Sequence, residues 1–217
     1  MQKLPAYLLF SLIMAVIYIS AFAGFFINRN IVLTKEAILL SLLSNLFLMG
    51  GGALLVVYLI YDGSILDAFK NLYFVKKGVG RAIFYGIAMT IFFIGIMAGI
   101  GCLFKEKNPL GEEIGSNVDL SLLILIPVVS SISEETFFRG LIQMQMEKKV
   151  NYIIAIVISS ILFSLAHIEY GVFIEIIATF LFSLLLGYIM HVTKNIIAPI
   201  TAHFMYNFLV LLTFLYK

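Results

Sequence analysis

The sequence has few charged residues, one cysteine and no internal repeat, and these shortages exclude several classes of protein. Only 12% of the 217 residues are charged, whereas 62% are hydrophobic. Soluble domains contain roughly 25% charged residues, and a soluble core of this length could not bury so many apolar side chains. A membrane is therefore the expected solvent. The net charge of +2 is too small to indicate a nucleic-acid partner.

The single cysteine, the glycines and the first apolar stretch give no indication of a disulfide, a phosphate-binding loop or a cleaved signal peptide. Cys102 is the single cysteine, so no internal disulfide can form, and we interpret it as a buried, inert thiol. The sequence contains no Gly-rich phosphate loop. Its first apolar stretch, residues 5–27, exceeds the roughly 7–15-residue core of a signal peptide. This length predicts a retained first span.

The apolar runs predict an all-α fold, a polytopic transmembrane bundle of about seven helices, within a range of about six to eight. They are longer than barrel strands and lack the alternation that such strands show. The predicted spans cover residues 5–27, 37–61, 82–104, 120–148, 152–167, 171–192 and 196–216.

The connection between the second and third spans carries apolar residues at helical spacing beside charged ones, which predicts a short helix at the membrane surface. The apolar residues are Ile65, Leu66, Phe69, Leu72 and Tyr73. Its basic residues are Lys70, Lys76, Lys77 and Arg81. By the positive-inside tendency they place this connection, the N-terminus and the Lys148-Lys149 turn in the cytoplasm. The connections on the opposite side of the membrane carry Arg29, Lys35, Lys105 and Lys107, so the excess of basic residues on the cytoplasmic side is small.

Small and capping residues have structural interpretations. Residues 50–52 are three consecutive glycines, and Gly95 and Gly99 are spaced one turn apart. We expect both groups to let helices approach closely. Asp119 is expected to cap the helix that follows it.

Ionisable residues inside spans are costly, about 2.5–3.5 kcal/mol each at a helix centre, and here they concentrate in the C-terminal half. Glu135 and Arg139 are four residues apart with the acid first, which favours an ion pair on one helix. Glu134 points about 100° away from Glu135 around the helix axis, so it is free to face another neighbour as a general base.

Two further spans carry polar residues one turn from a partner: Phe163 with His167, and His203 with Asn207. If the helix containing Glu134 continues to a turn near residues 149–151, then Glu134 and His167 both lie roughly 25 Å from that turn. His203 and Asn207 lie roughly 12 and 18 Å beyond the turn near residues 194–195. A tilt of their helix would bring them to the depth of Glu134 and His167. We expect Pro127 to kink or restart the first helix without affecting the part from Glu134 onward.

Structural interpretations remain open for each residue alone. Glu135 and Arg139 could form a purely structural pair, and a single membrane histidine, His167 or His203, is often an interhelical hydrogen-bond donor. The occurrence of all these residues together in the C-terminal spans is harder to explain by structural roles alone. Three other ionisable residues lie near span ends, where interfacial solvation satisfies them, and we expect no catalytic role for them. They are Glu169, Glu175 and His191.

The order Glu134-Glu135-x-x-x-Arg139, then Phe163-x-x-x-His167, then His203-x-x-x-Asn207 resembles the CPBP (CAAX protease and bacteriocin-processing, or Abi) family of intramembrane proteases. This family includes the type II CAAX prenyl endopeptidases. The resemblance covers about residues 130–207 and no motif position is missing. Residues 1–217 are then one membrane domain, in which 1–117 supply generic spans and 118–217 the catalytic helical core.

The resemblance implies peptide hydrolysis in the membrane of the cell, on a prenylated or leader-bearing membrane-associated peptide. Glu134 would activate water with assistance from His167, and His203 and Asn207 would stabilise the oxyanion. Supporting roles fall to Glu135, Arg139, Phe138 and Phe163.

Metal dependence and two other functions stay open. The sequence has no His-Glu-x-x-His helix, but Glu134, His167 and His203 could supply three zinc ligands. We favour a metal-free mechanism without a cofactor, because an asparagine beside a histidine suits oxyanion binding better than metal ligation. The alternatives are a noncatalytic bacteriocin-immunity membrane protein and a small proton-coupled transporter. The sequence does not indicate the oligomeric state.

Overall fold

The structure, a computed structural model, describes residues 3–26, 34–101 and 109–215. Every regular element in these residues is helical. The expectations for Cys102, Arg29, Lys105 and Lys107 lie outside the described residues. In chain order the elements are α1 (Leu4–Phe26), α2 (Lys35–Asn45), η1 (Leu46–Gly51), α3 (Gly52–Tyr61), α4 (Ile65–Asn71), α5 (Val79–Gly101), α6 (Pro109–Ser116), α7 (Leu120–Glu135), η2 (Thr136–Gln143), α8 (Met144–Met146), α9 (Tyr152–Leu165), η3 (Ile168–Tyr170), α10 (Phe173–Thr193) and α11 (Ile197–Leu215).

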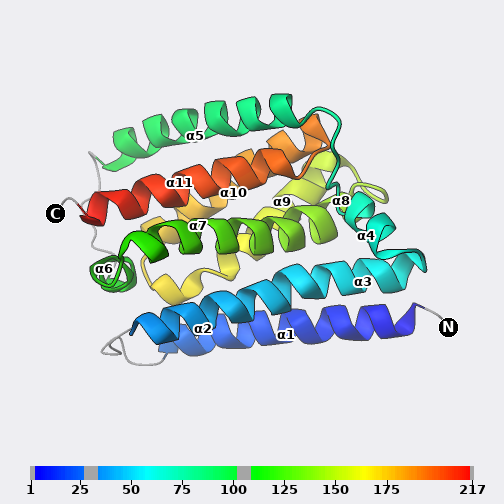
Figure 1. Cartoon of the computed structure of the whole chain (residues 1–217), viewed down its shortest axis with the longest axis horizontal. Coiled ribbons are helices and arrows are strands. Elements are labelled where there is room, and N and C mark those ends of the chain that lie inside the picture. The colour runs from blue at the N-terminus through cyan, green and yellow to red at the C-terminus, as the bar shows by residue number, and fades with distance from the viewer. Residues whose placement is uncertain (1–2, 27–33, 102–108, 216–217) are drawn as a thin grey trace.

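Seven helical stretches within the described residues are long and apolar enough to cross a membrane. They are Leu4–Phe26, Lys35–Tyr61, Val79–Gly99, Leu120–Met146, Tyr152–Tyr170, Phe173–Thr193 and Ile197–Phe214. Figure 1 shows the long helices running side by side along the longest axis of the molecule. The predicted multi-pass helical bundle is therefore confirmed, and the chain is an integral membrane protein.

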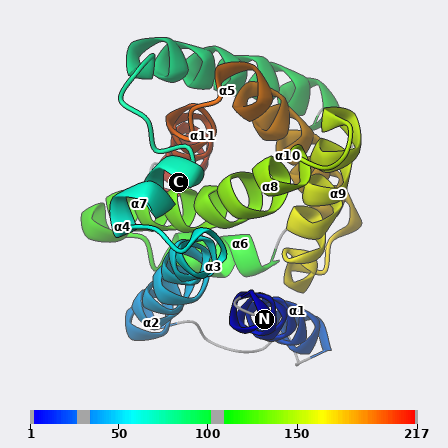
Figure 2. The same cartoon turned by 90° about the vertical axis from the view of Figure 1, so that its right-hand side faces the viewer.

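The stretch made of α7, η2 and α8 lies at the centre of the bundle. In the end-on view of Figure 2 it runs between α1, α2 and α3 on one side and α5, α10 and α11 on the other. It packs against α11, η1 and α2 through α7, and against α9 and α3 through η2. Of its most apolar window 56% is buried, against at most 39% for any other span. Polar side chains on this helix are therefore shielded from lipid.

This central helix differs from the expectation in where its irregularity falls. α7 continues through Pro127 rather than restarting there. It changes instead into the π-helix η2 directly after Glu135, a feature that the sequence did not predict. A π-helix is rare and occurs frequently at functional sites. Here it carries Arg139, which is fully buried.

Glycines decide where helices approach closely. A Cβ atom on Gly52 would lie 2.6 Å from Ile13 of α1, and one on Gly50 would lie 3.7 Å from the Cα atom of Ser133, as expected. Among the described residues no atom lies within 4 Å of such a Cβ on Gly95 or Gly99, so their predicted packing role was wrong. On α5 the close approach occurs instead at Gly86, whose Cβ would lie 2.7 Å from the Ala198 carbonyl oxygen of α11.

The predicted surface helix is α4. Ser64 and Asp67 form a capping box at its start, in which each side chain binds the backbone N–H of the other residue. Ala68 and Leu72 are buried against the bundle, whereas Leu66 is 70% exposed. Asp119 also caps as predicted, by accepting hydrogen bonds from the first backbone N–H groups of α7.

Candidate active site

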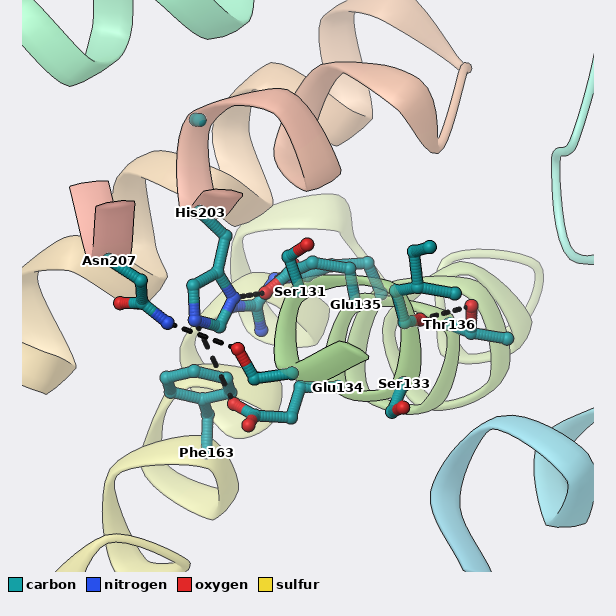
Figure 3. A network of polar contacts seen from close by, with 12 residues as sticks. Ser131, Ser133, Glu134, Glu135, Thr136, Phe163, His203 and Asn207 are labelled. Carbon is teal, nitrogen blue, oxygen red and sulfur yellow. Dashed lines mark hydrogen bonds and ion pairs between the residues drawn. The ribbon is translucent and has the colours of Figure 1, made fainter. Parts of the chain in front are cut away.

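Two adjacent glutamates occupy the last turn of α7, just before η2. Glu135 is fully buried and Glu134 is 7% exposed. Because successive residues of a helix point about 100° apart, the two carboxylates meet different neighbours. Figure 3 shows both beside His203 of α11, with Phe163 of α9 below them.

Glu135 bridges a cation and an imidazole. Its Oε2 atom lies 3.0 Å from Arg139 Nε, which is an ion-pair distance. The N–H of Nε does not point at this oxygen well enough to form a hydrogen bond. Its Oε1 atom lies 2.7 Å from His203 Nδ1. Arg139 also donates from Nη1 to Ser159 Oγ at 3.3 Å, and Ser159 donates to the Phe138 carbonyl. A buried carboxylate paired in this way fixes the orientation of the His203 ring.

The carboxylate of Glu134 faces the imidazoles of His167 and His203, and one of its two oxygens forms no hydrogen bond with the described residues. Its Oε2 atom lies 3.6 Å from His167 Nε2 and 4.0 Å from His203 Nε2. Within the described residues this buried oxygen has no hydrogen-bond partner. An unpaired buried carboxylate oxygen is costly, so it marks a place where a further polar group is accommodated.

The hydrogen bonds on the far side of each ring determine which nitrogen faces Glu134. His167 Nδ1 lies 2.8 Å from the carbonyl oxygen of Phe163, which can only accept, so Nδ1 carries the proton. The Nδ1 atom of His203 likewise donates to the Glu135 carboxylate. The Nε2 atoms of both rings are therefore turned toward Glu134, each oriented by a partner at its other nitrogen.

Asn207 is oriented by a serine of α7. Ser130 Oγ donates to the Ile126 carbonyl at 2.7 Å, which uses its single proton. It must therefore accept from Asn207, whose Nδ2 atom lies 3.2 Å away. This order of donors assigns the amide group: Nδ2 faces α7, and its second N–H remains available to the site.

Aromatic rings form the wall around these groups. The Phe163 ring packs edge-on against Phe138 with 5.1 Å between ring centroids, and lies 4.7 Å from the His167 ring. The guanidinium of Arg139 sits over Phe163 at 4.8 Å. Phe182 of α10 adds a ring 5.8 Å from His203. Such a wall lowers the local dielectric constant and strengthens the polar contacts inside it.

The structure brings together the eight residues that the sequence singled out. Two contributors were missed: Ser130, which orients Asn207, and Ser159, which links Arg139 to the backbone of Phe138. Ser130 could have been found, because it lies one turn before Glu134 on the same helix face. Ser159 gave no comparable signal.

Three other ionisable residues were expected to have no catalytic role, and of these Glu169 is close enough to the cluster to interact electrostatically with His167 and Glu134. His191 lies 2.8 Å from Glu147 and stacks on Tyr152 near the last turn of α10. Glu169 belongs to η3, where it packs close to α1, and Glu175 is in the first turn of α10. Among the described residues, no group of three His, Cys, Asp or Glu side chains has the arrangement of a metal site.

Comparison with known families gives one match. Residues 116–209 match the family described as Type II CAAX prenyl endopeptidase Rce1-like. No match was found among curated proteins or solved structures. The matched segment runs from the end of α6 to α11 and contains every residue of the cluster described above. The resemblance to this family is thus confirmed for the C-terminal part of the chain.

Proposed function

We propose, from the Rce1-like type II CAAX prenyl endopeptidase segment at residues 116–209, that this protein is an intramembrane endopeptidase in which Glu134 activates water. The observation that carries the proposal is the buried, unpaired Oε2 atom of Glu134, which faces the Nε2 atoms of His167 and His203. A water molecule bound among these three groups would have its proton acceptor within reach.

The reaction uses the groups as follows. Glu134 takes one proton from water, whose oxygen attacks the carbonyl carbon of the substrate peptide. The oxyanion that forms accepts a hydrogen bond from Asn207 Nδ2 and one from the Nε2–H of a protonated His203, which Glu135 stabilises. When the C–N bond breaks, the proton held by Glu134 passes to the leaving nitrogen, with His167 Nε2 as the relay.

The metal-free form of this mechanism is part of the proposal. The zinc alternative would use Glu134, His167 and His203 as ligands, although among the described residues these side chains do not have the arrangement of a metal site. In that case zinc would polarise the substrate carbonyl and lower the pKa of its bound water. We favour the metal-free form because Asn207, one turn from His203 and already oriented by Ser130, suits an oxyanion rather than a metal.

The location of the site supports a substrate class. The cluster lies in the most buried helix of a membrane bundle, which favours a membrane-associated peptide, and we propose that this peptide is prenylated, as the description of the matching family suggests, or leader-bearing. The start of α1, α4 and α8 lie at the same end of the bundle in Figure 1. We propose that this end faces the cytoplasm of a cell membrane, because it carries the basic connection that contains Lys76 and Lys77.

The test compares wild type with Glu134→Gln for cleavage of a lipidated peptide in detergent. We expect a loss of about 10²–10⁴-fold in rate, since glutamine cannot take the proton. Glu112→Gln, an exposed position on α6, is the matched control and should retain full activity. Both are measured after exhaustive chelation and after zinc addition. Cleavage by Glu134→Gln at the wild-type rate would refute the proposal, and activity that needs zinc would refute its metal-free form.

A further inference from the structure

One end of the bundle carries a group of cations without carboxylate partners. Lys70 and Lys194 are paired, with Asp67 at 3.1 Å and Glu147 at 2.6 Å. The other basic side chains of this end are exposed, and within the described part of the chain none of the following four contacts a carboxylate. They are Lys76, Lys77, Arg81 and Lys149, which we call the basic platform. Lys148, beside them, donates hydrogen bonds to the neutral side chains of Tyr61 and Gln145.

Hydrogen bonds anchor the segment of the basic platform that carries Lys76 and Lys77. The Asn195 amide donates to the carbonyls of Val75 at 3.0 Å and Lys77 at 3.2 Å, and it is 1% exposed. The backbone N–H of Ile196 donates to the carbonyl of Tyr73 at 3.1 Å. Residues 73–77 are thus fixed against the turn between α10 and α11. The cations are presented on an ordered surface rather than on independent loops.

An apolar strip borders the basic platform. On α4, Ile65 is 60% exposed, Leu66 70% and Phe69 38%, although the opposite face of this short helix is buried. In the turn after α8, Val150 is 40% exposed beside Lys149. Apolar side chains next to unpaired cations match the boundary of a bilayer, where acyl chains and phosphates lie a few ångströms apart.

We propose that the basic platform binds the phosphate groups of anionic phospholipids in the adjoining leaflet. α4 lies with Ile65 and Leu66 among the acyl chains, and Lys76, Lys77, Arg81 and Lys149 face the headgroups. Each cation near an anionic surface raises binding by about fivefold, so four unpaired cations give a clear preference over zwitterionic lipid. The proposal is independent of the proposed protease activity, since Glu134 lies 15 residues, or about four helical turns, before Lys149 and takes no part in the basic platform.

The experiment measures lipid selectivity of the full-length protein. The protein is reconstituted into phosphatidylcholine vesicles that contain spin-labelled phosphatidylglycerol or spin-labelled phosphatidylcholine, and the fraction of each label immobilised at the protein is compared. Wild type should select phosphatidylglycerol several-fold, and added salt should reduce the preference because screening weakens exposed charges. The variant K76Q/K77Q/R81Q/K149Q should lose the preference.

The matched control is the charge-preserving variant K76R/K77R/R81K/K149R, which should select phosphatidylglycerol as wild type does. Helical content and thermal unfolding in pure phosphatidylcholine show that each variant is folded. Equal selectivity in the glutamine variant and wild type would overturn the proposal. Inorganic phosphate that displaces the labelled lipid at low ionic strength, where sodium chloride of equal ionic strength does not, would also overturn it in favour of a site for free phosphate.

Discussion

The Nδ1 atom of His203 lies 2.7 Å from Oε1 of Glu135, although the two residues are 68 positions apart in the sequence. This contact fixes α11 against α7 and separates the tasks of the two adjacent glutamates. Glu135 is paired with His203 and Arg139, whereas Oε2 of its neighbour Glu134 has, among the described residues, neither a hydrogen-bond partner nor an arginine or lysine beside it.

The two glutamates should therefore respond differently to the same substitution. Glu135→Gln leaves the fully buried Arg139 without its countercharge, which should lower the free energy of unfolding by about 3–5 kcal/mol and reduce cleavage with it. Glu134→Gln should slow cleavage about 10²–10⁴-fold while the thermal unfolding midpoint stays near wild type. Thermal unfolding and peptide cleavage of both variants test this. If Glu135→Gln were as stable as wild type, the proposed division of tasks would be wrong.

Ser130 should affect turnover through Asn207. Ser130→Ala removes the acceptor that orients the Asn207 amide, a hydrogen bond of about 0.5–1.5 kcal/mol, so kcat should fall about 3–10-fold with KM unchanged. Ser131→Ala is the control, because Ser131 is equally buried and donates only to the Val128 carbonyl. In an Asn207→Ala background, Ser130→Ala should have no further effect. An equal loss in that background would show that Ser130 acts elsewhere.

Much of the fold could be predicted because membrane spans follow from apolar length, and the seven spans were identified to within a few residues. The polar cluster was predictable for a related reason. Placing Glu134, His167 and His203 in lipid costs free energy, so these side chains are expected to face one another inside the bundle. The sequence did not predict η2, because a π-helix depends on packing against neighbouring helices rather than on local residue type. Nor did it reveal that Gly86, and not Gly95, is the close-packed glycine of α5, because composition does not say which face meets α11.

These two glycines provide a direct test of packing. Gly86→Ala would place a Cβ 2.7 Å from the Ala198 carbonyl oxygen and from Thr201 Cβ, so α5 and α11 must separate. We expect a loss of about 1–3 kcal/mol in the free energy of unfolding. Gly95→Ala meets open space and should leave stability unchanged or raise it by up to about 1 kcal/mol. Thermal unfolding in the same detergent compares them, and identical midpoints would contradict the observed packing.

Glu147 should make stability depend on pH. Burial acts to raise the pKa of this carboxyl, but hydrogen bonds from Gln143, Lys194 and His191 outweigh it and hold the pKa below its ordinary value. A lowered pKa means that the ionised carboxylate stabilises the fold above the pKa of the unfolded chain. This stabilisation is lost as the pH falls through the lower, folded-state value.

Glu147→Gln should accordingly be less stable than wild type at neutral pH, and the difference between the two should shrink on acidification below about pH 4.5. Unfolding midpoints across this pH range measure the difference. A gap that stayed constant or widened toward low pH would show that the carboxylate of Glu147 does not carry the stabilisation.

The π-helix η2 also affects how this chain is compared with its relatives. A π segment holds one residue more than the α-helix that spans the same rise, and each residue turns an α-helix by about 100°. A relative with a regular helix here would keep both flanks in place only if it were one residue shorter between Thr136 and Gln143. An ungapped alignment with such a relative would therefore match Gln143 and Glu147 to residues that face a different neighbour.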